Sequence, residues 1–168
     1  MPISLHHAVV TPMLQTLGAA QTWLAKAQAA GLPEAEITSA RLIDDMLPFA
    51  YQVKSMATHS HGAILGVRAG TFSPDMEIPA TMAQLQDILA EAESFLQGVE
   101  EAELESLIGQ DMRFQFKDYM VPFAAEDFLL TFSLPNFYFH ATTTYALLRA
   151  RGVAVGKRDY LGQMRVKA

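Results

Sequence analysis

Apolar residues recur every three or four positions along much of this chain, and that spacing predicts a helical fold. The first such stretch runs over about Leu5–Ala29. Its apolar stripe consists of Val9, Met13, Leu17, Ala20 and Leu24. Gly31 and Pro33 predict where this helix ends, because glycine suits the left-handed conformation after a helix and proline cannot continue one.

A second helix is expected over about Glu34–Val67, again with an apolar stripe on one face. The stripe consists of Leu42, Met46, Phe49, Val53, Met56, Ile64 and Val67. Pro48 lies inside this span and predicts either a kink or a helix that restarts after a short break. A third helix is expected from a cap at Thr81, with Gln84 completing a capping box, to about Gln97.

The last third of the chain combines a strand pair with a long helical region. Apolar and polar residues alternate over Met112–Val121, which predicts a short hairpin with Asp118 near its turn. The span Ala125–Arg151 is expected to be helical with a bend or interruption at Pro135. The remainder, Val153–Ala168, lacks a helical period and is expected to be an extended strap.

Four helices of these lengths, joined mostly by short loops, predict an all-α four-helix bundle with one long connection. A small hairpin precedes its last helix. The chain of 168 residues fits one hydrophobic core, so residues 1–168 are expected to form a single domain. An irregular α+β domain is the rival architecture, but one short hairpin does little to support it.

Composition excludes several classes of protein. There is no cysteine, which rules out disulfides, thiolate metal sites and cysteine nucleophiles. The net charge is −6, and ten acidic residues but no Lys or Arg lie between Ala69 and Met112. We therefore expect no nucleic-acid partner. No apolar run is long enough to cross a membrane, so we expect no membrane partner. The N-terminus has no basic segment followed by an apolar one, so we expect no secretory signal, and the lack of cysteine fits a cytoplasmic location.

The helix after Pro135 carries the first candidate site. Asn136 and His140 are four residues apart, so both lie on one helix face, one turn from each other. Two imidazoles at this spacing would clamp a metal ion, but an amide is a weak ligand for a transition metal. On spacing alone, the alternative is a hydrogen-bonded core or interface His140 with Asn136 as the helix cap.

Three parts of the chain together resemble a known family. They are Ala40–Pro48 with Gln52 and Val53, then Pro135–Arg149, then Gly156–Gly162. The run Pro135–His140, followed by Leu147–Arg149, is similar to the last helix of the DinB-like superfamily of metal-dependent bundles. More closely, the chain resembles an uncharacterised domain-of-unknown-function branch of that superfamily, found in bacteria and fungi. This resemblance implies helices in up-down-down-up order.

The resemblance also implies a site. The two C-terminal histidines of the superfamily fall on Asn136 and His140, and the histidine of its second helix falls on Gln52. One histidine and two amides offer a zinc or nickel ion little charge or softness. We therefore expect a degenerate metal pocket that binds a small polar ligand. No cofactor is expected beyond a weakly held Zn or Ni ion with His140 as its ligand.

Two further residues are candidates for the rim of this pocket. His59 lies one heptad after Gln52, and Asp45 lies one heptad before it, on the expected second helix. The alternative for His59 is a surface position. For Asp45 the alternative is a helical ion pair with Arg41, which lies four residues earlier.

The tail carries a cluster of charged and aromatic residues, for which two interpretations remain. Lys157 or Arg158 would bind an anion if the tail closed over the pocket. Otherwise Tyr160 and Leu161 would anchor the strap across the helices.

Three functions stay open at this point. The leading hypothesis is a homodimeric DinB-like bundle of unknown biochemical function that binds a small-molecule ligand. The dimer follows from the resemblance and from the many aromatic and methionine side chains. A second hypothesis is a metal- or thiol-cofactor-dependent transferase or hydrolase with His140 as ligand or general base. The third is a non-catalytic, stress-related interaction protein.

Overall fold

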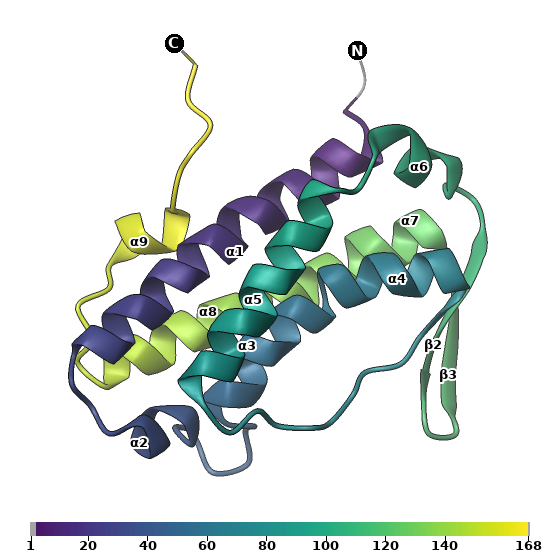
Figure 1. The fold of residues 1–168 in the computed structure, drawn as a ribbon. Helices are drawn as coiled ribbons and strands as arrows, with labels where there is room; N and C mark the ends of the chain where they lie inside the picture. Colours follow the sequence, from purple (N-terminus) through teal and green to yellow (C-terminus); the bar gives the residue numbers. More distant parts are fainter. Residues whose placement is uncertain (1–2, 168) are drawn as a thin grey trace.

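A computed structural model describes residues 3–167, which are mostly helical and carry one small three-stranded sheet (Figure 1). The longer helices are α1 (Leu5–Ala29), α3 (Phe49–Thr58), α4 (His61–Ala69), α5 (Met82–Gln97) and α8 (Leu134–Ala150). The shorter helices are α2 (Glu34–Thr38), α6 (Glu101–Ser106), α7 (Ala125–Asp127) and α9 (Lys157–Leu161). A π-helical segment, η1 (Phe128–Ser133), joins α7 to α8. The strands are β1 (Thr71–Phe72), β2 (Asp111–Phe116) and β3 (Tyr119–Ala124).

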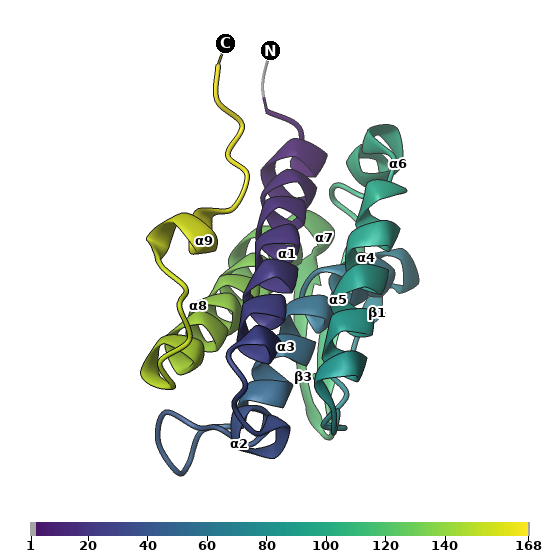
Figure 2. The ribbon, with the colours of Figure 1, turned by 60° about the vertical axis from the view of Figure 1, so that its left-hand side comes forward.

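The long helices lie side by side, as two views of the ribbon show (Figure 1, Figure 2). Helix α3 packs against α8 and α5, and α1 packs against α5 and α8. Helices α1 and α8 run in one direction, whereas α3, α4 and α5 run in the opposite direction (Figure 1). None of the helices within residues 3–167 combines the length and the apolar character that crossing a bilayer requires.

Helices α1 and α5 have the bounds that the sequence predicts, and their first turns show why. The Ser4 hydroxyl accepts a hydrogen bond from the backbone N–H of His7 at the start of α1. At the start of α5, Thr81 and Gln84 form the predicted capping box. These side chains satisfy backbone N–H groups that have no partner inside the helix.

The second predicted helix is wrong in extent. A loop of residues 39–48 separates α2 from α3, and α4 follows α3 after a break at Ser60, which has φ −117° and ψ −84°. Pro48 has an extended conformation directly before α3, so it starts that helix instead of kinking a longer one. Leu42 lies in the loop and is 49% exposed, although the predicted stripe placed it in the core.

The predicted hairpin is confirmed as β2 and β3, and each strand has six residues. A third strand, β1, pairs in parallel with β2, through Thr71 opposite Arg113 and Phe72 opposite Phe114. Two residues are too few to show the alternation that identifies a strand. The small sheet corrects the all-α fold class to a mostly helical fold with a three-stranded sheet.

The region after the hairpin is helical, as predicted, but η1 has wide π turns. Pro135 is the second residue of α8, so the helix changes from π to α turns next to a residue that cannot donate a backbone N–H. The C-terminal strap is not wholly extended, because Lys157–Leu161 forms α9. Asp159 Oδ2 accepts a hydrogen bond from the backbone N–H of Gly156 at 2.7 Å and thereby caps this single turn.

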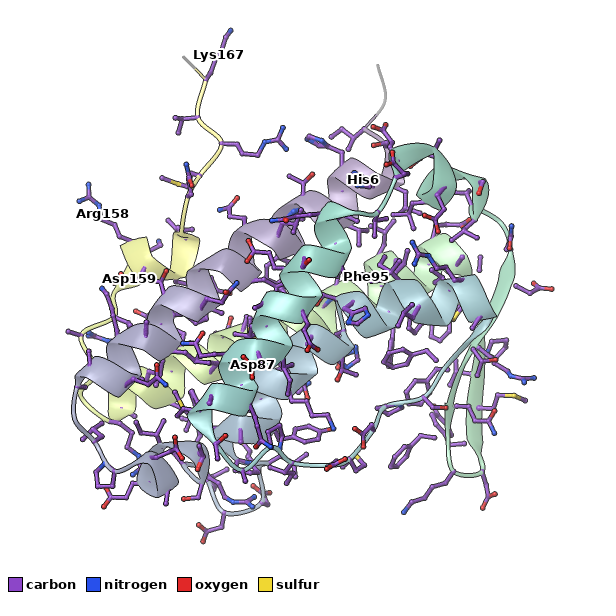
Figure 3. The ribbon with its side chains drawn as sticks, in the orientation of Figure 1. His6, Asp87, Phe95, Arg158, Asp159 and Lys167 are labelled. Carbon is purple, nitrogen blue, oxygen red and sulfur yellow. The ribbon has the colours of Figure 1, made fainter. Side chains whose placement is uncertain are left out.

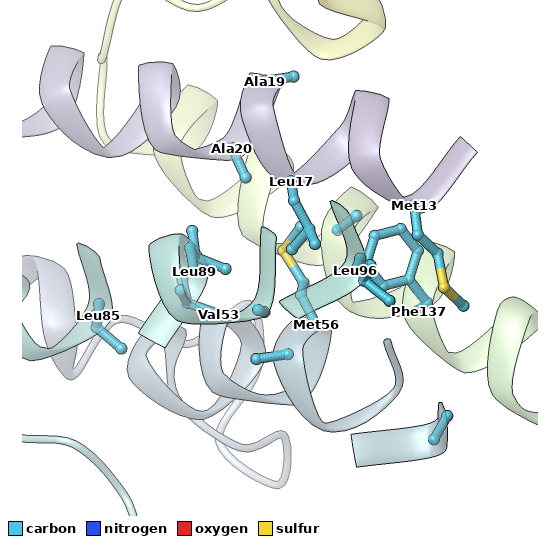
Figure 4. Packing of buried hydrophobic residues seen from close by; sticks show 14 of the residues in the cluster. Met13, Leu17, Ala19, Ala20, Val53, Met56, Leu85, Leu89, Leu96 and Phe137 are labelled. Carbon is cyan, nitrogen blue, oxygen red and sulfur yellow. The ribbon is translucent and has the colours of Figure 1, made fainter. Parts of the chain in front are cut away.

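One hydrophobic cluster joins the long helices (Figure 4). Met13 and Leu17 of α1, Met56 of α3 and Phe137 of α8 are all 0% exposed within it. Helices α8 and α3 pack against each other, and this contact brings polar residues of the two helices together. His140 lies three positions after Phe137 and Gln52 four before Met56, so both lie beside this contact.

Two glycines of α4 should respond to alanine in opposite directions. A Cβ on Gly66 would lie 2.9 Å from Phe72 Cβ, whereas a Cβ on Gly62 would lie 3.8 Å from the Phe72 ring. Gly66→Ala is expected to lower the free energy of unfolding by about 1–3 kcal/mol through overpacking. Gly62→Ala should raise it by about 0.5–1 kcal/mol, since alanine favours a helix more than glycine does. Urea unfolding of the two variants measures both; equal effects would contradict this packing.

Candidate functional site

The candidate site forms where α3 meets α8. His140 of α8 and Gln52 of α3 are hydrogen-bonded, with Nδ1 of the imidazole 2.7 Å from Oε1 of the amide. Gln52 is held in turn by Leu47, whose backbone carbonyl accepts a hydrogen bond from Gln52 Nε2 at 2.9 Å. Gln52 is only 2% exposed. The amide is therefore fixed in the core and orients the imidazole.

This network defines the proton positions on His140. Because Gln52 Nε2 donates to Leu47, Gln52 Oε1 faces the imidazole and accepts a hydrogen bond from His140 Nδ1–H. Nε2 of the neutral ring then carries a lone pair. In residues 3–167, Thr144 Oγ1 is the only fully buried side-chain N or O atom without a hydrogen-bond partner. Nε2 of His140 has no partner among these residues either, so it reaches solvent.

His59 lies against His140. It is the residue directly after α3, and its ring stacks on the His140 ring with centroids 5.7 Å apart and planes 16° apart. The Ser133 hydroxyl donates to the His59 backbone carbonyl at 3.0 Å, and Ser133 Oγ lies 3.5 Å from His59 Nδ1. His59 is 7% exposed, so its surface interpretation is wrong. The heptad spacing from Gln52 indicated this position, although His59 lies directly after α3 and not within a continuous helix.

Both imidazoles are uncharged at neutral pH. Burial lowers the pKa of His140 to about 4. Burial, and to a lesser degree the neighbouring His140, lowers the pKa of His59 to about 3. Removing an imidazolium from water is costly, and two stacked cations would repel each other. The stacked pair therefore presents neutral nitrogen acceptors.

The other two predicted site residues lie differently from the expectation. Asn136 is not the cap of α8, because the helix begins at Leu134 and Asn136 Nδ2 donates to the Phe132 carbonyl at 2.7 Å. Asp45 is exposed in the loop before α3, so it is on no helix and forms no helical pair with Arg41. The Arg41 guanidinium instead donates to the Met46 backbone carbonyl.

Two aromatic residues that the sequence did not single out as site residues flank His140. The Tyr51 ring lies edge-on to the imidazole with centroids 6.2 Å apart, and the Phe139 ring does so at 5.2 Å. Phe139 is 54% exposed on this chain. Tyr51 follows no recognisable pattern, and only its position next to Gln52 could have drawn attention to it.

The tail contacts α1 and, through Tyr160, Thr142 of α8, and no hydrogen bond joins it to Gln52 or His140 within residues 3–167. Helix α9 packs against α1, and Tyr160 stacks on Trp23, which confirms Tyr160 as an anchor of the strap. The Leu161 backbone carbonyl accepts a hydrogen bond from Gln15 Nε2 at 2.6 Å. Arg158 projects outward from α9 (Figure 3) and is exposed. It lines a surface hollow of about 980 Å³ beside α1, whose lining does not include His140.

Comparison with known proteins places this arrangement in a family. The model of a domain of unknown function (DUF1993) matches residues 5–161. The chain belongs to the DUF1993 family. A crystal structure of a DinB family member protein from Shewanella denitrificans is similar to this DUF1993 chain, with a TM-score of 0.82 and 25% sequence identity. The alignment covers 98% of this chain and 95% of that chain. No curated protein matches the sequence.

The family and the DinB-like fold that the sequence indicated are thus both confirmed. The DinB-like resemblance raises the question of whether a metal ion fits the DUF1993 site. Gln52 Oε1 accepts a hydrogen bond from His140 Nδ1–H, so the amide oxygen and that imidazole nitrogen cannot both turn to one ion. Within residues 3–167, no three His, Cys, Asp or Glu side chains gather as metal ligands. The donors at this site fit a transition metal poorly.

Proposed function

We propose that this DUF1993 domain binds a small polar ligand at the His140 imidazole without a tightly held transition metal. The Gln52–His140 hydrogen bond is the observation that carries this proposal. It fixes the imidazole in one tautomer and leaves Nε2 free, accessible and neutral. A buried amide that orients an accessible acceptor is typical of a binding site.

The low proton affinity of His140 favours a binding function over a catalytic one. A general base works best when its pKa lies near the working pH. Burial holds the pKa of His140 at about 4, so the imidazole is a weak base but still a good hydrogen-bond acceptor. We therefore place the transferase or hydrolase hypothesis second. The homodimer remains a prediction, which sedimentation of the purified chain tests.

The opposed helix directions support a finer assignment of the fold. Helix α1 and helix α8 run one way, whereas the segment made of α3 and α4, and helix α5, run the other way (Figure 1). We propose that these four helical segments form the up-down-down-up bundle that the DinB-like resemblance implies.

Metal analysis together with nitrogen NMR tests the proposed binding mode. Protein purified without chelator or affinity tag is expected to carry far less than one zinc or nickel ion per chain. Long-range proton–nitrogen NMR should show His140 protonated on Nδ1 and unprotonated on Nε2 at neutral pH. Stoichiometric metal that is lost on His140→Ala would overturn the proposal.

A substitution of Gln52 sharpens this test. Gln52→Glu keeps the side-chain shape but places a carboxylate on His140 Nδ1, which should raise the pKa of the imidazole and protonate Nε2 more readily. Gln163→Glu, on the exposed tail, adds the same charge as a control. The NMR signal of Nε2 should titrate at higher pH in the first variant only. An unchanged titration in Gln52→Glu would show that Gln52 does not orient His140 in solution.

A further inference from the structure

We propose that the ligand is an uncharged molecule that carries a hydroxyl group on an apolar body, such as a phenol or an aliphatic alcohol. This inference rests on the proposed function and specifies the class of ligand for the same site. Three observations carry it: the free neutral acceptor, the lack of an available charge, and an apolar rim.

The free Nε2 of His140 is an acceptor, so the ligand should carry a hydrogen-bond donor. His140 Nδ1 is already bonded to Gln52, so the free lone pair on Nε2 is the group through which the imidazole can contact a ligand. A hydroxyl O–H donates well to a neutral ring nitrogen. Since the acceptor lies beside buried groups, a ligand that lacked the donor would leave Nε2 without a partner and lose affinity.

Among residues 3–167, the imidazole is hydrogen-bonded to an uncharged amide and to no charged side chain, so the site shows no counter-charge for an ionic ligand. The nearest cation along α3, Lys54, is one turn from Tyr51, and its Nζ donates to Asp75 Oδ2 at 2.6 Å and to the Glu77 carbonyl at 2.5 Å. Asp75 is paired with the same lysine. Burial alone accounts for the lowered pKa of His140, so no charged residue acts strongly on it. A carboxylate or ammonium ligand would therefore lose its hydration without gaining a partner.

The rings of Tyr51 and Phe139 flank the imidazole, and two further partly exposed apolar residues are hydrogen-bonded to Tyr51 and to Gln52. Leu47, whose carbonyl holds Gln52, is 36% exposed, and Phe139, whose ring meets the imidazole, is 54% exposed. The Tyr51 hydroxyl donates to Met76 Sδ at 3.4 Å, and Met76 is 47% exposed. Single exposed apolar residues are ordinary, but aromatic rings that flank an unpaired polar atom are typical of a ligand site. The apolar body of the ligand would rest on this rim.

Fluorine NMR with a matched set of probes tests the class of ligand on the wild-type protein at neutral pH. Para-fluorophenol carries the donor, para-fluoroanisole lacks it, para-fluorobenzoate is an anion and para-fluorobenzylamine is a cation. The phenol should bind, and the other three should bind at least about tenfold more weakly, which corresponds to one lost hydrogen bond. Equal binding of the anisole, or tighter binding of either ion, would overturn the inference.

Nitrogen NMR of the wild-type protein locates the contact without any substitution. Addition of the phenol should shift the Nε2 signal of His140 toward lower frequency, because the nitrogen then accepts a hydrogen bond. His140→Phe keeps an aromatic ring but removes the acceptor, and it should weaken phenol binding about tenfold. His7→Phe, at an exposed position on α1, is the control and should bind like the wild type.

The outcomes separate this inference from the proposed function. If Nε2 is free and neutral but the phenol leaves its signal unchanged, the ligand class is wrong and the acceptor site stands. If Nε2 is protonated or bound to a metal in the resting protein, the proposed function fails, and the ligand class fails with it.

Discussion

The free energy of unfolding should fall by about 4 kcal/mol between pH 7 and pH 5, with His59 and His140 contributing about 2 kcal/mol each. Both imidazoles protonate near pH 6.5 once the chain is unfolded, whereas burial lowers their pKa in the folded protein to about 3 and about 4. Below pH 6.5 the unfolded state therefore binds protons that the folded state does not bind. Acid then favours unfolding.

The acidic residues act in a different pH window. The hydrogen bond from Lys54 lowers the pKa of Asp75, and the hydrogen bond from Lys26 lowers that of Asp159, each from 3.8. The stability they contribute is present above that value and is lost only as the pH falls further. His61, whose pKa burial also lowers, adds to the loss in the same direction as the buried pair. Between pH 6.5 and about 4, the histidines dominate.

Urea unfolding at several pH values measures this loss. The double variant His59→Gln, His140→Gln will be less stable at pH 7, so the decisive quantity is the change in unfolding free energy from pH 7 to pH 5. In the wild type this change is expected to be about 4 kcal/mol, and in the double variant most of it should disappear. Gln52→Glu should reduce it partly, because the new carboxylate raises the pKa of His140. An equally steep loss in all three proteins would show that the imidazoles are not buried as described.

Local signals in the sequence were enough to predict some helices but not others. Helices α1 and α5 carry both an apolar stripe and a capping residue, so their period and their ends agree. The second helix failed because the loop residues Leu42 and Met46 continue the apolar spacing of α3 by chance. Spacing reports which residues could share a face, but only the tertiary fold decides whether that face is buried.

The sequence predicted the candidate site only in part, again because contacts in the tertiary fold decide its geometry. Gln52 and His140 are 88 positions apart, and the DinB-like resemblance was needed to bring them together. Their hydrogen bond, and the Leu47 carbonyl that holds Gln52, depend on how a loop turns before α3. The stack of His59 on His140 forms directly after the end of α3, although the apolar spacing predicts an uninterrupted helix at this position. Loop and helix-end geometry therefore set the chemistry of this site.

Trp23→Ala is expected to lower the free energy of unfolding by about 3–5 kcal/mol, because it removes the largest fully buried side chain of α1. Trp23 also fastens the tail. Its ring stacks on Tyr160 with centroids 5.4 Å apart, and its Nε1 donates to the Asp159 carbonyl at 2.8 Å. Loss of the ring should therefore both destabilise the core and free α9. Urea unfolding followed by circular dichroism measures the first effect, and amide hydrogen exchange of the tail measures the second.

Two milder variants separate the core from the tail. Tyr160→Ala keeps Trp23 in the core but removes the stack and the hydrogen bond of the Tyr160 hydroxyl with Thr142, so tail amides should exchange faster while global stability falls by only about 1–2 kcal/mol. Because Trp23 is the one tryptophan in the chain, its fluorescence should shift to the red as the tail leaves. Tyr119→Ala, at a position 65% exposed on the hairpin, serves as the matched control and should change neither signal. If Tyr160→Ala left both the emission and the exchange unchanged, the tail would be held by its backbone contacts instead, chiefly those of Gln15 and Arg149.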